Sequence, residues 1–247
     1  MPHADEGGHD TEAEDRDLRA HATEGADDFA DVRHLEEEWA VSDFDRTHVF
    51  TTAAVWEIPV GRGRHFLTDA PGVVNHLLGG WSINTIYTYM TGEPFQVNSN
   101  QRTNNSAHVS RALVTDPTLR ARLSELPNVT GPVVFENQNG LAVPPPGSNG
   151  SGRNIFRGPS YWNVDLGIVK TFSITERVRF QFRTEMFTAF NHANFDNPRS
   201  ASVGSPSLGS SQFGRTCCTT VAPPTSQNVI QTGESARIIQ FGGKLQF

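Results

Sequence analysis

The clearest pattern in the chain is an alternation of apolar and polar residues between positions 158 and 195. In the second half of this stretch, one parity is mostly apolar and the other carries charge. The apolar parity contains Val178, Phe180, Phe182, Met186 and Phe190, and the polar parity contains Arg179, Gln181, Arg183 and Glu185. A period of two residues is typical of a β-strand. Residues 161–172 alternate in the same way, and the polar segment 173–177 separates the two stretches, so we predict an antiparallel hairpin.

Three further segments alternate with the same period. They are residues 46–59, residues 78–97 and the last twelve residues, 236–247. The first of these ends at Pro59 and two nearby glycines, and both residue types weaken or end strands. The chain is therefore predicted to be all-β, with about five antiparallel strands.

A soluble sheet and a membrane barrel wall both remain possible from this pattern. Each has one apolar face and one face in contact with water. The hairpin alone favours the soluble sheet, because soluble sheets are commoner. Aromatic residues near strand ends, such as Trp81, Tyr87 and Tyr89, favour the barrel wall, which carries aromatic girdles at both interfaces. The last segment also ends on an aromatic residue, Phe247.

Two connections are long and rich in Asn, Ser, Pro and Gly, namely residues 98–157 and 192–231. Structureless loops of this length are uncommon inside compact soluble domains, whereas long extracellular loops are usual in outer-membrane barrels. We expect a short helix within the first loop, at residues 113–126, and a short helix or a loop at residues 31–39.

Two adjacent cysteines, at positions 217 and 218, lie in the second loop. A disulfide between neighbouring residues strains the peptide, so we expect the two thiols to be free or paired elsewhere.

Charge divides the chain into two parts. Residues 1–45 contain 16 of the 27 acidic residues and three arginines, whereas the remainder is net basic. A polar composition with a high net charge favours disorder. We therefore expect residues 1–45 to be an acidic, largely disordered arm or an extracellular loop, and residues 46–247 to be a partial barrel. The first 26 residues also lack the basic start and apolar core of a secretory signal peptide.

Residues that could support catalysis or metal binding are scarce. The histidines at positions 3, 9, 21 and 34 match no metal-ligand spacing. The glycines beside Arg62 lack the Lys-Ser/Thr pair of a phosphate-binding loop, and no Ser-His-Asp or Cys-His arrangement stands out. We therefore predict no enzymatic activity, no catalytic residue, no cofactor or metal site, and no nucleic-acid partner.

Five segments, taken together and in order, resemble one known family. They read SDFDRTHVFTTAAVWEIPVGRGRHFL, GGWSINTIYTYMTGEPFQV, NIFRGPSYWNVDLGIVKTF, FRTEMFTAFNHANFDNP and ARIIQFGGKLQF. They cover most of residues 42–247 and resemble the C-terminal barrel segment of Oar-like TonB-dependent outer-membrane receptors. The resemblance implies a closed barrel of about 22 strands around a plug domain, in the bacterial outer membrane. We therefore expect this chain to be a fragment that lacks the N-terminal barrel and the plug.

The resemblance also implies a function and partners. The function is energised transport of a large or scarce solute. The partners are the outer-membrane lipid, the barrel assembly machinery and, through the full-length receptor, the TonB energy-coupling complex. Two alternatives stay open: a surface adhesin or carbohydrate- or protein-binding β module without transport, and a soluble β-sandwich.

Parity assigns candidate site residues to the two faces of the predicted wall. We expect five polar residues to face the lumen: Asp165, Arg179, Arg183, Glu185 and Lys244. The resemblance implies that four apolar residues of the last strand form the barrel assembly signal: Ile239, Phe241, Leu245 and Phe247. Gly243 departs from that signal, which prefers a larger apolar residue.

Lys170 shares the apolar parity, and we expect its ammonium group to reach water at the periplasmic rim. The same topology puts residues 61–76 and 173–177 on the periplasmic side and the two long loops outside.

Overall fold

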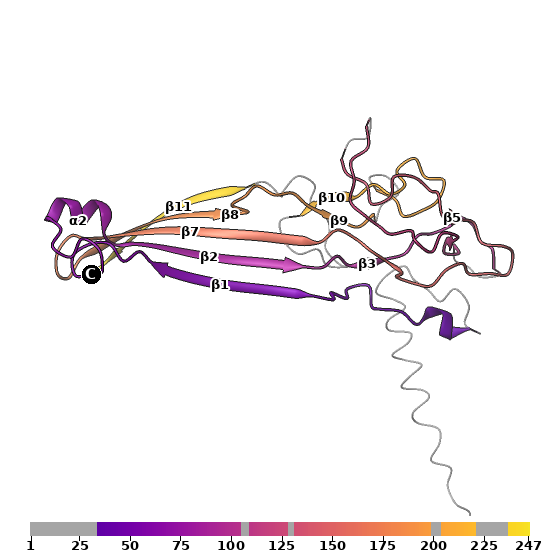
Figure 1. Ribbon diagram of the computed structural model, residues 1–247, viewed down its shortest axis with the longest axis horizontal. Coiled ribbons are helices and arrows are strands. Elements are labelled where there is room, and N and C mark those ends of the chain that lie inside the picture. Colours follow the sequence, from indigo (N-terminus) through magenta and orange to yellow (C-terminus); the bar gives the residue numbers. More distant parts are fainter. Residues whose placement is uncertain (1–33, 105–108, 128–130, 199–203, 221–236) are drawn as a thin grey trace, which may run out of the picture.

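A computed structural model describes residues 34–104, 109–127, 131–198, 204–220 and 237–247. Five long strands lie side by side in one sheet, and shorter strands and loops gather beyond one end of it (Figure 1). The helix α2 and the C-terminus lie at the opposite end. Residues 1–33, which make up most of the predicted acidic arm, lie outside the described residues.

The long sheet is an antiparallel meander in the order β1-β2-β7-β8-β11. Its strands are β1 (Val49–Glu57), β2 (Trp81–Met90), β7 (Tyr161–Ser173), β8 (Arg179–Phe187) and β11 (Ile238–Gln246). Each strand overlaps a segment that the alternation predicted, so the all-β antiparallel fold is confirmed. Within the described residues, β1 and β11 each pair with a single strand, which leaves the sheet with two edges.

The connections at the α2 end differ in length. A tight turn joins β7 to β8, where the amide of Ile174 donates to the carbonyl of Val178 at 2.9 Å. The connection from β1 to β2, residues 58–80, is longer and contains α2 (Gly72–Leu78), which begins directly after Pro71. Among the described residues, no helix is long and apolar enough to cross a membrane.

The connections at the other end form a compact unit, here called the loop cap, which comprises the described parts of residues 91–160 and 188–220. Three short strand pairs build it: β3 (Pro94–Phe95) with β6 (Phe156–Arg157), β4 (Leu113–Val114) with β5 (Leu141–Ala142), and β9 (Asn194–Asp196) with β10 (Cys217–Thr220). The side chains of the two cysteines lie outside the description, so their predicted state stays a prediction.

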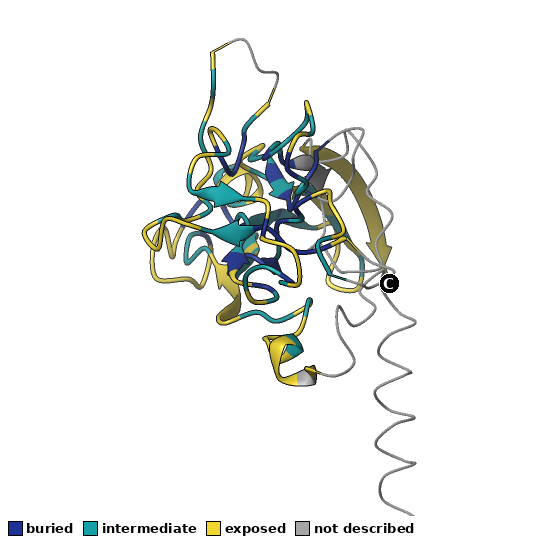
Figure 2. Ribbon diagram, turned by 90° about the vertical axis from the view of Figure 1, so that its right-hand side faces the viewer, coloured by how far each residue is buried: buried dark blue, intermediate teal, exposed yellow. Residues whose placement is uncertain are grey.

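The buried apolar core lies in the loop cap and not in the long sheet. It consists of Phe95, Val97, Ala112, Val134, Phe135, Phe156 and Leu208. The rings of Phe135 and Phe156 meet edge to face with their centroids 5.0 Å apart. Figure 2 shows buried segments among the loops at this end. The long loops are thus more closely packed than their polar composition indicated.

The helix expected at residues 113–126 is wrong. Leu113 and Val114 extend to pair with β5, and the chain then turns at Asp116. The Asp116 carboxylate accepts hydrogen bonds from the amide and the hydroxyl of Thr118, at 2.8 and 2.7 Å. Such local side-chain bonds favour a turn over a helix, and they hold the pKa of Asp116 below its ordinary value. Residues 31–39 do contain a short helix, the 3₁₀ helix η1 (Leu35–Glu38).

The segment before β1, residues 36–45, is attached to the loop cap and is here called the acidic strap. Its ion pairs with the cap are Glu38–Arg111, Asp43–Arg153 and Asp45–Arg157. The next residue, Arg46, pairs with Glu93 of the cap at 2.7 Å, with both side chains at most one-tenth exposed. The part of the acidic arm nearest to β1 therefore has a defined place along the cap.

Candidate functional site

The strand register separates the side chains of the long sheet into two faces, because residues paired across strands point to the same side. Glu185 pairs with Gly167 on one neighbouring strand and with Gln240 on the other, and Gly167 pairs with Asn84. We call the face that carries this row, and every second row from it, the polar face. All five residues predicted to face a lumen lie on it: Asp165, Arg179, Arg183, Glu185 and Lys244.

The opposite parity defines the apolar face. Three residues of the predicted assembly signal, Ile239, Phe241 and Leu245, lie on it, and Phe247 directly follows β11. The Phe241 side chain is 69% exposed, and its ring stacks on that of Phe182 with centroids 6.1 Å apart. Exposed aromatic and aliphatic side chains in a contiguous row mark a surface that contacts lipid or another protein.

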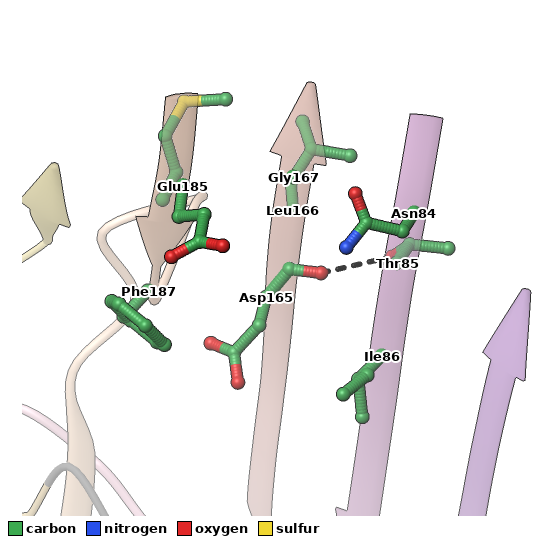
Figure 3. A pocket seen from close by; sticks show the side chains of 9 residues that line it. Asn84, Thr85, Ile86, Asp165, Leu166, Gly167, Glu185 and Phe187 are labelled. Carbon is green, nitrogen blue, oxygen red and sulfur yellow. Dashed lines mark hydrogen bonds between the residues drawn. The ribbon is translucent and has the colours of Figure 1, made fainter. Parts of the chain in front are cut away.

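The polar face is hollowed between β2, β7 and β8 by a depression of about 210 Å³. Five side chains of the polar face line it: Asn84, Ile86, Asp165, Glu185 and Phe187 (Figure 3). Gly167 also lines the depression and has no side chain. A Cβ atom at Gly167 would lie 2.3 Å from the Asn84 side-chain oxygen, so the glycine leaves room for Asn84.

The Asp165 carboxylate is held in place by two donors. Its Oδ1 accepts hydrogen bonds from the Asn163 side-chain amide at 2.8 Å and from the Thr188 backbone amide at 3.0 Å. On the other side of the strand, the Thr85 hydroxyl donates to the Asp165 backbone carbonyl at 3.1 Å (Figure 3). Thr85 thus satisfies its hydroxyl within the sheet, although it has the parity of the apolar face.

The Glu185 carboxylate joins β8 to β11 and to its own strand. It accepts a hydrogen bond from the Gln240 side-chain amide and lies 3.7 Å from the Arg183 guanidinium. Arg183 and Glu185 therefore form an ion pair along the strand. Both side chains are about a third exposed or more, so the pair contributes little to stability.

The chemistry of the polar face is hydrogen bonding to polar molecules. Carboxylates, amides and guanidinium groups supply both acceptors and donors around the depression. Among the described residues, no group of three His, Cys, Asp or Glu side chains lies close enough to hold a metal ion. The polar face is therefore a water-exposed surface that offers both donors and acceptors to polar molecules.

Lys170 does not reach water as predicted. The residue is only 3% exposed, and its ammonium group donates to the backbone carbonyls of Leu77, at 3.2 Å, and Gly79. It also lies 5.1 Å from the centre of the Trp81 ring and 5.0 Å from that of Phe172. The carbonyls at the C-terminal end of α2 therefore replace water. Sequence reasoning missed α2, although a proline directly before a short apolar run is a helix-start signal.

An aromatic cluster marks the loop-cap end of the apolar face. The His192 ring stacks on Trp162 with centroids 4.1 Å apart, and Phe190 lies beside Trp162 at 6.3 Å. Burial lowers the pKa of His192 below its ordinary value. Trp162 lies in a segment whose alternation is visible in the sequence, but His192 lies in a loop, where no period predicts its position.

A comparison with family models adds one finding to this geometry. A model described as "Outer membrane beta barrel domain" matches residues 12–240. The match includes β1, β2, β7 and β8 in full and the beginning of β11. Neither the comparison with curated proteins nor the comparison with solved structures finds a match.

Proposed function

The chain belongs to the outer membrane β-barrel domain family and is located in the outer membrane, and from that premise we propose a function in transport. In this proposal the five-stranded sheet is part of the wall of an Oar-like, TonB-dependent receptor. The receptor mediates energised transport of a large or scarce solute across the outer membrane. The wall itself supplies no catalytic step.

The observation that carries the proposal is the separation of the two faces. The register places Asp165, Arg183 and Glu185 on one side and Phe182 and Phe241 on the other. A lipid-facing surface must be apolar, whereas a water-filled lumen accepts charge. The polar face therefore lines the lumen in this proposal, and its hydrogen-bonding groups meet the solute.

The two edges of the sheet support a wall that continues beyond these strands. Within the described residues, β1 and β11 each have an unpaired side. In lipid, each unsatisfied backbone group costs several kcal/mol, so an open edge is not tolerated there. We propose that further strands of the receptor pair with both edges and that a plug fills the barrel.

The ends of the strands support an orientation for this wall. The tight turn 173–177 and the connection 58–80 lie at one end, and the loop cap lies at the other (Figure 1). Outer-membrane barrels have short turns in the periplasm and long loops outside the cell. The loop cap is therefore the extracellular part that first meets the solute.

The test compares three strains of the source bacterium: the wild type, a strain without this protein and a strain without TonB. Growth is measured on a panel of sole nutrients supplied at limiting concentration. We expect the strain without the protein to lose growth on one nutrient and the strain without TonB to lose growth on the same nutrient. Uptake that requires the protein but not TonB would contradict energised transport.

A second candidate function is a surface adhesin or a carbohydrate- or protein-binding module without transport. The packed core of the loop cap supports it, because a rigid cap presents a fixed binding surface. The same strains separate the two candidates. A strain without the protein that keeps all nutrient uptake but loses attachment to a glycan- or protein-coated surface would favour the adhesin.

A further inference from the structure

The apolar surface of the sheet continues onto the connection between β1 and β2. Five apolar side chains of this connection are between 49% and 73% exposed: Phe66, Leu67, Val73, Leu77 and Leu78. We propose that α2 and the turn before it form an interfacial anchor that lies in the periplasmic leaflet of the outer membrane. The occupant of this apolar surface is phospholipid. The inference rests on the proposed function, which turns the apolar face of the wall toward lipid.

The position of α2 over the apolar face carries the inference. Trp81 and Lys170 pair directly in the register and both have the apolar parity. The Trp81 ring nitrogen donates to the Leu77 carbonyl at 3.0 Å, and the Lys170 ammonium donates to the same oxygen at 3.2 Å. Two side chains on the apolar face thus hold the C-terminal end of α2. The helix lies on the side of the wall that faces lipid and not on the lumen side.

The connection is rigid enough to keep its apolar residues in place. The Asn75 side-chain oxygen accepts a hydrogen bond from the Arg62 amide at 2.7 Å, which ties α2 to the preceding turn. Gly61 and Gly79 approach so closely that a Cβ atom at Gly61 would lie 2.9 Å from the Gly79 Cα. The turn therefore packs against the end of the helix, and its exposed apolar surface is a fixed feature of the fold.

The environment of Lys170 also indicates that α2 lies near the membrane interface. A lysine on the lipid side of a barrel is costly near the membrane midplane and is tolerated near the interface. Here the helix carbonyls stabilise its charge, because the C-terminal end of a helix attracts cations. Lys170 and α2 therefore form one unit at the rim of the wall.

The charges of the connection fit lipid headgroups. Arg62, Arg64 and His65 are exposed beside Phe66 and Leu67 in the same turn. Interfacial segments bury apolar side chains at the boundary between headgroups and acyl chains and keep basic residues among the phosphates. Arg64 pairs at 2.9 Å with Glu57, which has the parity of the polar face, so Arg62 and His65 are the basic residues of this turn that remain for the headgroups.

The experiment measures lipid contact at α2 in the full-length protein. Leu77→Cys is introduced together with Cys217→Ser and Cys218→Ser, and the new thiol is labelled with an environment-sensitive fluorophore. The protein is reconstituted into vesicles of phosphatidylethanolamine and phosphatidylglycerol that contain spin-labelled lipid. Matched controls are Phe182→Cys on the apolar face and Glu176→Cys in the exposed turn between β7 and β8. Val73→Cys repeats the measurement if the Leu77 variant does not insert.

The anchor predicts quenching of the Leu77 label by a spin label near the headgroup and no quenching at Glu176. It also predicts that Lys170→Met causes loss of quenching at Leu77 without a change at Phe182. Quenching at Phe182 but not at Leu77 would overturn the anchor and leave the proposed wall intact. Protection of the Leu77 label from water without lipid quenching would overturn it in favour of a protein partner or a second copy. Absence of quenching at Phe182 would refute the wall orientation itself.

Discussion

Arg111 and Glu38, which are 73 positions apart in the sequence, form an ion pair between the loop cap and the acidic strap. The Arg111 Nη1 atom lies 2.8 and 2.9 Å from the two carboxylate oxygens. Both side chains are at most one-tenth exposed. Arg111 also donates through Nε to the carbonyl of Ser151 at 2.7 Å, so its guanidinium is fixed from two sides. The pair therefore attaches the chain before β1 to the interior of the cap.

Glu38→Ala is expected to lower the free energy of unfolding of the cap by about 3–5 kcal/mol, because it leaves the Arg111 charge buried without its partner. Asp45→Ala is the matched control. Asp45 pairs with Arg157 in the same strap, but both side chains are more than a third exposed, so its loss costs about 0–1 kcal/mol. Urea unfolding in lipid vesicles measures both values. Equal effects of the two changes would contradict a buried role for Glu38.

Composition alone could not predict the strap. It indicated an acidic, largely disordered arm or an extracellular loop over residues 1–45, because a count of charges does not show which charges meet. The partners Arg111, Arg153 and Arg157 lie in a loop that follows two strands, and only the folded cap brings them to the strap. The core of the cap escaped prediction for the same reason, since its residues come from separate short segments without a period.

Phe182→Arg and Gln181→Arg test the assignment of the faces, because the two residues are adjacent on β8 and point to opposite sides. Phe182 pairs with Lys170 in the register and therefore lies between the periplasmic rim and the bilayer midplane, so arginine there is expected to cost less than the about 2–4 kcal/mol of the midplane but more than at the interface. Arginine at residue 181 is on the polar face, which lines the water-filled lumen in the proposed wall, so it is expected to be nearly neutral. The measurement is the folding free energy of the full-length protein in lipid vesicles. Equal tolerance of both substitutions would refute the assignment.

The strands themselves were predictable because alternation is a local property. Every second residue of a strand points to the same face of the sheet. Parity alone therefore placed Asp165, Arg183 and Glu185 on one face. Lys170 broke the pattern, and the sequence offered only water as its partner. The partner that the structure provides is the end of α2, which lies more than 90 positions away. A local pattern contains no information about such a contact.

The stack of His192 on Trp162 predicts a loss of stability in mild acid. Burial lowers the pKa of His192 below its ordinary value of 6.5. As the pH falls below 6.5, the unfolded chain binds a proton before the folded protein does, and unfolding becomes more favourable. The loss is complete once the pH lies below the pKa in the folded protein.

The measurement for this prediction is the urea midpoint of the wild type and of His192→Asn, which cannot titrate, between about pH 5 and 8. We expect the difference in urea midpoint between the two proteins to be constant at pH values above the ordinary histidine pKa of 6.5. Below it, the wild type is expected to lose stability relative to the variant. A gain of stability of the wild type in acid would instead indicate that the imidazolium is attracted to the Trp162 ring and outweighs the cost of burial.

Gly167 and Asn84 are expected to be strongly coupled, because the Asn84 side chain occupies the space that a side chain at Gly167 would need. In Gly167→Ala, the new methyl group lies where the Asn84 side chain now rests, and all three of its nearest atoms belong to Asn84. Overpacking of this kind costs about 1–3 kcal/mol. Asn84→Ala removes every one of those contacts, so the double variant is expected to recover most of the loss. A double-mutant cycle of unfolding free energies in lipid vesicles measures the coupling. Additive effects of the two substitutions would show that the backbone of β7, and not Asn84, requires the glycine.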